Sequence, residues 1–117
     1  MNLNPDDFTN SAWQGIIDSK DLALTEKHQT LETEHLFCSL LKKNEIAIKA
    51  IERSGGEIKN LLTEIEDFIK NQPKMLKPQE SIFFGKNISF SISRAINIKE
   101  SFKDDFISSE HLVISLF

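Results

Sequence analysis

Residues 106–117 read Phe-Ile-Ser-Ser-Glu-His-Leu-Val-Ile-Ser-Leu-Phe, and they repeat a pattern that occurs earlier in the chain. Residues 31–41 read Leu-Glu-Thr-Glu-His-Leu-Phe-Cys-Ser-Leu-Leu. An offset of 76 positions (107 − 31 = 76) aligns the two without a gap. The same offset pairs Phe8 with Phe84, Ile16 with Ile92 and Lys27 with Lys103. This period is longer than a solenoid repeat, so each copy is expected to be a small helical subdomain.

The overall composition is that of one globular domain with its own core. The 117 residues are 39% hydrophobic and 27% charged. The net charge is −4 and the basic residues are scattered, which disfavours a nucleic-acid partner. The chain has no apolar run of membrane-spanning length, and its first seven residues lack the basic and apolar regions of a signal peptide, so none is expected. Cys38 is the single cysteine and excludes an internal disulfide, so we expect a cytoplasmic protein without a membrane partner.

Hydrophobic periodicity predicts an all-α chain, because no segment shows the alternation of a strand. Copy one is expected to contain four helices. The first opens at Asp6 or Thr9, the second is capped by Thr33, the third is capped by Asn44, and the fourth covers residues 58–69.

Glycines supply two further expectations. Gly15 lies inside the first helix, where we expect it to allow the close approach of a neighbouring helix. The pair Gly55-Gly56 is expected to end the third helix through a left-handed backbone conformation.

Copy two begins at about Phe84, and its first helix is expected to face the core with one apolar stripe. The members of this stripe are Ile88, Ile92, Ala95, Ile96 and Phe102. Ser109 is expected to cap the next helix. Copy two stops at Phe117, within its second helix, so we expect a fragment of a longer protein with a truncated second repeat.

Several short motifs occur together in the order of a known family. They are the Phe8-Thr9 pair, Glu-His-Leu at 34–36 and 110–112, and the runs at 67–69, 72–74 and 105–110. Together they resemble the double Clp repeat, the N-terminal domain of the Clp ATPases, and most closely that of the ClpB-type disaggregases. The resemblance covers residues 5–117. It implies two tandem helical bundles related by a pseudo-twofold axis: repeat one at about 6–72, a linker at 73–80 bracketed by Pro73 and Pro78, and a partial repeat two at 81–117.

Catalytic chemistry is not indicated by any motif. The four glycines form no phosphate-binding loop, so ATP and Mg²⁺ are expected only in ATPase modules of a parent protein, and no cofactor or metal is expected in this chain. His35 and His111 are repeat-equivalent and are interpreted as helix-start packing rather than metal ligands. His28 is expected to be solvated in a polar turn, and Cys38 is expected to be a small buried hydrophobe.

A binding surface is a better-supported hypothesis. Phe90 and Ile98 lie eight residues apart, on one line of the predicted helix with Arg94 between them and off the core stripe. The resemblance implies an apolar substrate groove on the second repeat, with Ile98 and His111 at groove positions. It also implies functional polar roles for Thr9, Asp104 and Glu110. Arg94 departs from the family pattern, which has an aliphatic residue there.

Three functions remain open at this stage. The first is a domain that docks unfolded or aggregated polypeptides for a ClpB-type disaggregase, a hexameric ATP-dependent chaperone. The second is the adaptor-docking domain of a Clp protease unfoldase. The third is a stand-alone double-repeat protein that binds peptides without a motor.

Overall fold

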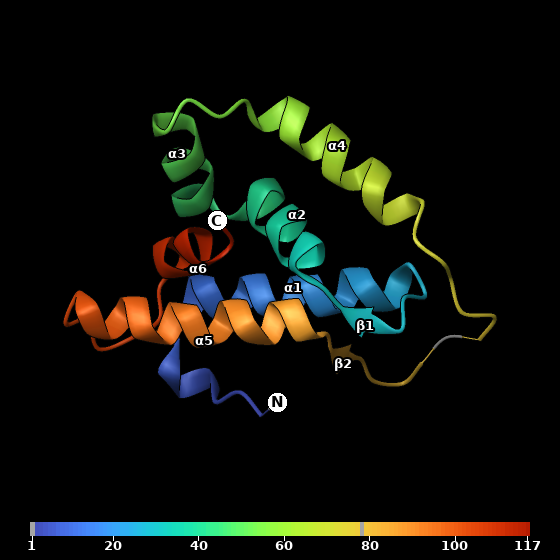
Figure 1. Ribbon diagram of the computed structural model, residues 1–117, viewed down its shortest axis with the longest axis horizontal. Coiled ribbons are helices and arrows are strands. Elements are labelled where there is room, and N and C mark those ends of the chain that lie inside the picture. Colours follow the sequence, from blue (N-terminus) through green and yellow to red (C-terminus); the bar gives the residue numbers. More distant parts are fainter. Residues whose placement is uncertain (1, 78) are drawn as a thin grey trace.

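A computed structural model describes residues 2–77 and 79–117. The chain is mostly helical, as predicted (Figure 1). The helices are α1 (Asn10–Thr25), α2 (Thr33–Lys43), α3 (Glu45–Arg53), α4 (Ile58–Lys70), α5 (Lys86–Ser101) and α6 (Ser109–Ser115), and a 3-10 turn covers Pro5–Asp7. Pro78, one end of the predicted linker, lies outside the described residues. None of the described helices has the length and apolarity that a membrane crossing needs.

Two strands of two residues each correct the prediction that the chain has no strand. β1 (Thr30–Leu31) pairs in parallel with β2 (Phe83–Phe84). Two residues are too few to display the alternation by which a strand is recognised in a sequence. The all-α class is unaffected, because the two strands have only two residues each and every other regular element of the described residues is a helix.

The predicted N-cap is confirmed for α3, and for α1 the second of the two alternatives, Asp6 and Thr9, is confirmed. Thr9 caps α1 by accepting from the backbone N–H of Ala12, at 3.3 Å, and Asn44 caps α3 through Ala47, at 2.9 Å. The caps of α2 and α6 are instead Glu32 and Ser108, one residue before the predicted Thr33 and Ser109. The reason lies in the histidine three residues later, which accepts a hydrogen bond from the cap's own backbone N–H, as in a capping box.

A single hydrophobic core joins the two copies. α2 packs on α1, and α6 packs on α5. Copy one supplies Ile16, Leu36 and Leu40, and copy two supplies Ile88, Ile92 and Leu112. Both glycine expectations are confirmed. A Cβ on Gly15 would lie 2.8 Å from Leu40 Cδ2, so the glycine permits the α1–α2 approach, and Gly55 has a φ of 91° after α3.

Backbone pairing between the copies follows the offset of 76 positions. Gly85 N donates to Leu31 O and Thr9 N donates to Ile107 O, both at 2.9 Å. Adding 76 to Thr9 gives position 85, and subtracting 76 from Ile107 gives position 31. Each copy therefore supplies its first short extended segment to the second extended segment of the other. A twofold axis through the whole molecule stays a prediction.

Two side chains of the predicted core stripe, Ile96 and Phe102, lie at the surface instead, and so does Phe68 of the fourth helix. Ile96 is 37% exposed and Phe102 is 57% exposed. α5 contacts α6 along one side, where Ile92 and Ala95 are buried, and Ile96 lies at the edge of that side, about 40° beyond Ile92 and about 100° from Ala95. Phe102 is the C-cap of α5, and its ring lies beside that of His111, with the ring centroids 5.7 Å apart. α4 has neighbours on one side only, so a regular apolar stripe there is covered incompletely (Figure 1).

The loop between α4 and β2 is attached to the turn that follows α1. Met75 N donates to Lys27 O at 2.8 Å, and Lys74 Nζ lies 2.9 Å from a carboxylate oxygen of Glu26. Further along, Gln79 Nε2 donates to the carbonyl of His28 at 3.2 Å. The loop therefore lies over residues 26–29 along much of its length.

Candidate functional site

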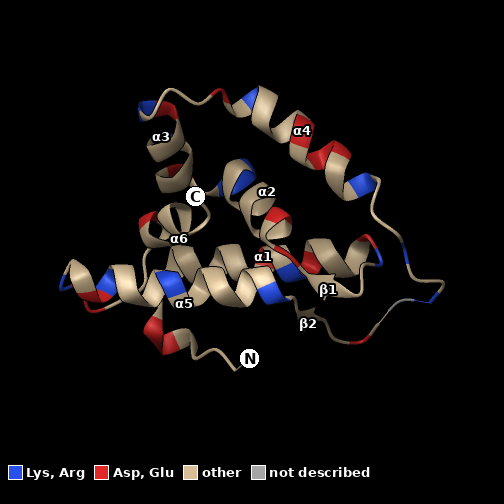
Figure 2. Cartoon of the chain, in the orientation of Figure 1, with Lys and Arg blue, Asp and Glu red and all other residues tan. Residues whose placement is uncertain are grey.

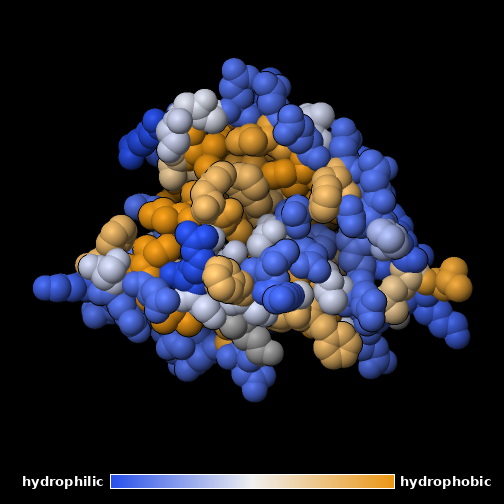
Figure 3. Space-filling model, viewed as in Figure 1, coloured by the Kyte–Doolittle hydropathy of each residue, from blue (hydrophilic) through white to orange (hydrophobic). Residues whose placement is uncertain are grey.

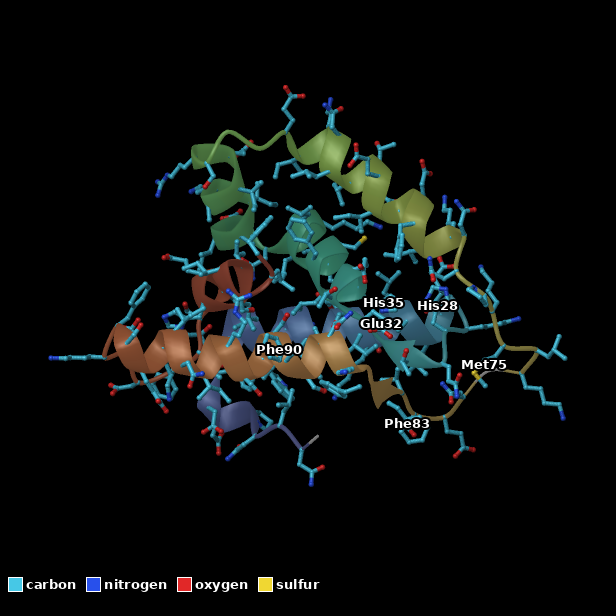
Figure 4. All side chains as sticks on the ribbon, viewed as in Figure 1. His28, Glu32, His35, Met75, Phe83 and Phe90 are labelled. Atoms are coloured by element: carbon cyan, nitrogen blue, oxygen red, sulfur yellow. The ribbon has the colours of Figure 1, made fainter. Side chains whose placement is uncertain are left out.

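The outward side of α5 presents an aromatic side chain to solvent. Phe90 is 67% exposed and lies in the first half of α5, with Phe83 exposed just before the helix (Figure 4). A shallow hollow of about 460 Å³ lies beside Phe90 and is otherwise lined by Lys86, Asn87, Ser89 and Ser93. Arg94 is exposed and Ile98 is half-buried, so both are at least partly accessible. This surface is apolar in part and edged by polar groups.

A second apolar hollow lies between α3, α4 and α6. Its volume is about 530 Å³, and its apolar lining includes Ala50, Ile51, Leu61, Val113, Ile114 and Phe117. Figure 3 shows hydrophobic side chains gathered in this region of the molecule. Glu110 lines this hollow and not the one beside Phe90. The predicted site residues are thus distributed over two surfaces rather than gathered in one groove.

His111 is part of the interior, with 2% of its surface exposed. Its Nδ1 accepts from the backbone N–H of Ser108 at 2.9 Å, so the ring proton is on Nε2. Nε2 lies 2.9 Å from Asp104 Oδ2 and donates to that carboxylate. The ring of Phe102 lies 5.7 Å from the His111 ring. These contacts make His111 a residue that positions the turn before α6, rather than an open surface for a ligand.

His28 corrects the sequence-based expectation of a solvated side chain, because it is 5% exposed. Its Nδ1 lies 2.8 Å from His35 Nε2 (Figure 4). The side chain is buried because the turn that carries it is covered by the loop after α4. Burial, together with the neighbouring His28, lowers the pKa of His35 to about 4, and burial also lowers the pKa of His28. The 76-residue offset pairs His28 with Asp104, and each of them lies against the histidine that begins the next helix. This correspondence could have indicated from the sequence that His28 contacts His35.

Thr9 contributes structure at the junction of the copies. It is half-buried, caps α1 and bonds through its backbone to Ile107. Nearby, Asn44 Nδ2 donates to Ser109 Oγ at 2.8 Å, and Ser109 Oγ lies 2.8 Å from Ser11 Oγ. This polar cluster ties α3 and α1 to α6. It was not predicted from the sequence, since the residues are far apart along the chain.

Cys38 lies in the interior, as predicted. Burial raises the pKa of its thiol, which opposes formation of a nucleophilic thiolate. Among the described residues, no group of three or more His, Cys, Asp or Glu side chains is arranged to hold a metal ion. Figure 2 shows acidic and basic positions interspersed along the helices.

Comparison with known proteins defines the class of this domain. The model of the Clp repeat (R) N-terminal domain matches residues 7–117, and the chain therefore belongs to that family. A chaperone protein ClpB from Prochlorococcus marinus is 41% identical over 116 residues, which are 99% of this chain and 13% of the relative. A chloroplastic chaperone protein ClpB2 from Oryza sativa is 38% identical over 113 residues, or 96% of this chain and 12% of the relative. The chain thus spans about an eighth of these relatives' length.

Solved structures share the fold at low sequence identity. The Hsp104 N-terminal domain from Candida albicans superposes with a TM-score of 0.86 at 19% identity, covering 94% of this chain and 73% of that one. A complex of the ClpV N-domain with a VipB peptide superposes with a TM-score of 0.76 at 10% identity, covering 98% of this chain and 76% of that one. The helical architecture is therefore that of the Hsp104 and ClpV N-domains.

Proposed function

We propose that this chain is the substrate- or partner-docking N-terminal domain of a ClpB-type disaggregase, and that it binds unfolded or aggregated polypeptides. The observation that carries the proposal is the 67% exposure of Phe90 on α5. A large aromatic side chain on a rigid helix contributes apolar contact area at little entropic cost. Membership of the Clp repeat family and the ClpB relatives support the same assignment.

The proposed docking surface follows one line of α5. Phe90, Arg94 and Ile98 are spaced by four residues and so lie on the same side of the helix. Phe90 would contact apolar side chains of the client, and Ile98 would extend that contact towards the end of α5. Arg94 between them adds a positive charge that favours clients with a nearby carboxylate.

The remaining predicted residues have supporting roles in this proposal. Thr9, Asp104 and His111 would hold the segments around α5 and α6 in place through the hydrogen bonds described above. Glu110 is exposed and would act at the adjoining hollow between α3, α4 and α6. For the parent protein we propose ATPase modules that bind ATP and Mg²⁺, a hexameric assembly and a cytoplasmic location. A ClpV N-domain in complex with a VipB peptide supports peptide docking as a use of this fold.

The test is client binding by the Phe90→Asp and Ile98→Asp variants of this chain. Each should weaken binding of a fluorescent, permanently unfolded client by at least about tenfold, the loss typical of a buried interface anchor. Phe68→Asp changes an exposed aromatic side chain on α4 and is the matched control. It should bind the client as tightly as the wild-type chain does.

Thermal unfolding of all three variants is measured alongside binding. If binding falls equally in Phe68→Asp, or falls only in proportion to stability, the α5 surface is not the docking site. Binding of folded adaptors without binding of the unfolded client would instead favour the domain of a Clp protease unfoldase.

A further inference from the structure

The two copies place different partners against equivalent histidines. In copy one, His35 Nε2 lies 2.8 Å from His28 Nδ1, and in copy two, His111 Nε2 lies 2.9 Å from Asp104 Oδ2. Both histidines begin a helix in the same way, because Nδ1 accepts from the backbone N–H three residues earlier. The contrast is therefore confined to the partner, an imidazole in one copy and a carboxylate in the other.

The hydrogen bonds determine where the protons of the His28–His35 pair are located. Glu32 N donates to His35 Nδ1 at 2.9 Å, so the proton of His35 is on Nε2 and is donated to His28 Nδ1. The proton of His28 is then on Nε2, a buried atom without a hydrogen-bond partner among the described residues. Both nitrogens that could accept a further proton are already accepting a hydrogen bond.

An additional proton must therefore break one of these bonds. A proton added to His28 Nδ1 would face the N–H of His35, and a proton added to His35 Nδ1 would face the N–H of Glu32. Either position places two donors less than 3 Å apart. The added positive charge would also be buried. In copy two the equivalent ring faces the carboxylate of Asp104, which is an acceptor and not a second imidazole.

The turn that carries His28 is also the attachment point of the loop after α4. Lys27 O accepts from Met75 N, and the carbonyls of His28 and Gln29 accept from Gln79 Nε2. His28 and His35 lie together with Ile69 and Gln72 in the wall of one hollow at the end of α4. Displacement of the His28 ring would therefore disturb the turn, the loop and the last turn of α4 together.

We propose that the His28–His35 pair is a pH-sensitive clamp, which holds the loop between α4 and β2 on the turn at residues 26–29 only while both imidazoles are neutral. The closed pair resists protonation, whereas the histidines of the open form take up protons at about pH 6.5, so acidification from about pH 7 to pH 5 favours opening of this end of the domain. The equivalent turn around Asp104 lacks the histidine pair and is expected to stay closed. The clamp does not depend on the docking function proposed above.

Other charged groups surround the histidine pair, but they do not account for the proposed pH response. They are Glu26 on the turn, Lys70 on α4, Lys74 on the loop, and Glu32 and Glu34 at the start of α2. Glu26 favours protonation of the histidines, but Lys74 opposes that of His28 and holds the pKa of Glu26 below its ordinary value. The Glu26–Lys74 pair therefore persists through the range in which the histidines gain protons.

Amide hydrogen exchange in the wild-type chain tests the clamp at two matched positions. The reporters are the N–H of His28, bonded to Ala23 O at 3.0 Å, and the N–H of Met75. The control is the N–H of Asp104, which makes the equivalent bond to Lys99 O at 3.1 Å. After correction for intrinsic exchange, protection of both reporters should fall by at least about tenfold between pH 7 and pH 5, and that of Asp104 should fall by much less.

The His28→Asp variant places the pair of copy two in copy one. It should abolish the acid-dependent loss of protection at Met75, because a carboxylate compensates a protonated His35. Parallel changes at the reporters and at Asp104, or an unaltered loss in His28→Asp, would overturn the proposal. If the variant does not fold, the imidazole resonances of the wild-type chain decide. A folded chain in which either histidine is protonated while Met75 keeps its protection refutes the clamp.

Discussion

The carboxylate of Glu32 lies against Gly85, at the point where α5 begins, and a Cβ on Gly85 would overlap it. Gly85 is the N-cap of α5 and offers no side chain of its own. The 76-residue offset pairs Gly85 with Thr9, whose hydroxyl caps α1. Copy one thus brings a negative charge to the N-terminus of a helix in copy two, where the helix dipole favours it.

This relationship predicts that Gly85→Ala destabilises the domain by about 1–3 kcal/mol, since the added methyl must displace a held carboxylate. Glu32 accepts from Thr30 Oγ1 at 2.7 Å, which restricts its movement. The same change in a Glu32→Ala background should cost little, because the overlap is absent. Urea unfolding of the four proteins in this double-mutant cycle gives the coupling energy, and simple additivity would contradict the contact.

The pKa of about 4 for His35 predicts that acid destabilises the fold before the carboxylates titrate. In the unfolded chain a histidine takes up its proton near pH 6.5, while folded His35 resists protonation until about pH 4. The stabilising contribution is therefore complete above pH 6.5 and is lost as the pH falls towards 4. Between pH 7 and pH 5 the free energy of unfolding should fall by about 2 kcal/mol through this residue alone.

Urea denaturation of the wild-type chain and of His35→Gln over that pH range tests the assignment. The glutamine variant should show a much flatter dependence, because it has no proton to gain at that position. Identical pH profiles for the two proteins would assign the effect to other groups.

Asn44 is expected to be among the most sensitive polar positions. Its Oδ1 caps α3 through Ala47, and its Nδ2 donates to Ser109 Oγ in α6. Asn44→Ala should cost about 2 kcal/mol, from the lost cap and from weakened pairing of a buried hydroxyl. Asn44→Asp keeps a capping oxygen and loses the donor, so thermal unfolding should rank it between the wild type and Asn44→Ala. An aspartate variant as unstable as the alanine variant would mean that the cap contributes nothing.

Two residues on α5 test which side of that helix faces the core. Ile92 is 1% exposed, and Ile92→Ala should cost about 2–4 kcal/mol through the cavity that it leaves. Phe90→Ala removes an exposed ring and should change the free energy of unfolding by less than about 0.5 kcal/mol. Chemical denaturation of both variants decides the orientation, and comparable losses would show that Phe90 is packed.

The surface of α5 could be predicted only in part. Phe90 was expected off the core stripe and is exposed, because a spacing of eight residues defines a line on any helix. Ile96 and Phe102 were expected on the core side and are exposed, since periodicity locates an apolar stripe but does not set its width. That width depends on how much of α5 its neighbours cover.

The helical class and most helix starts could be predicted from the sequence, because N-caps and helical periodicity involve residues only a few positions apart. Tertiary structure alone decided that His28 is buried against His35, that Glu32 lies against Gly85, and that Asn44 meets Ser109. Each of these depends on the loop or helix from a distant segment that covers the site. Such burial and such contacts cannot be predicted from local sequence, because they arise only when distant segments pack around one core.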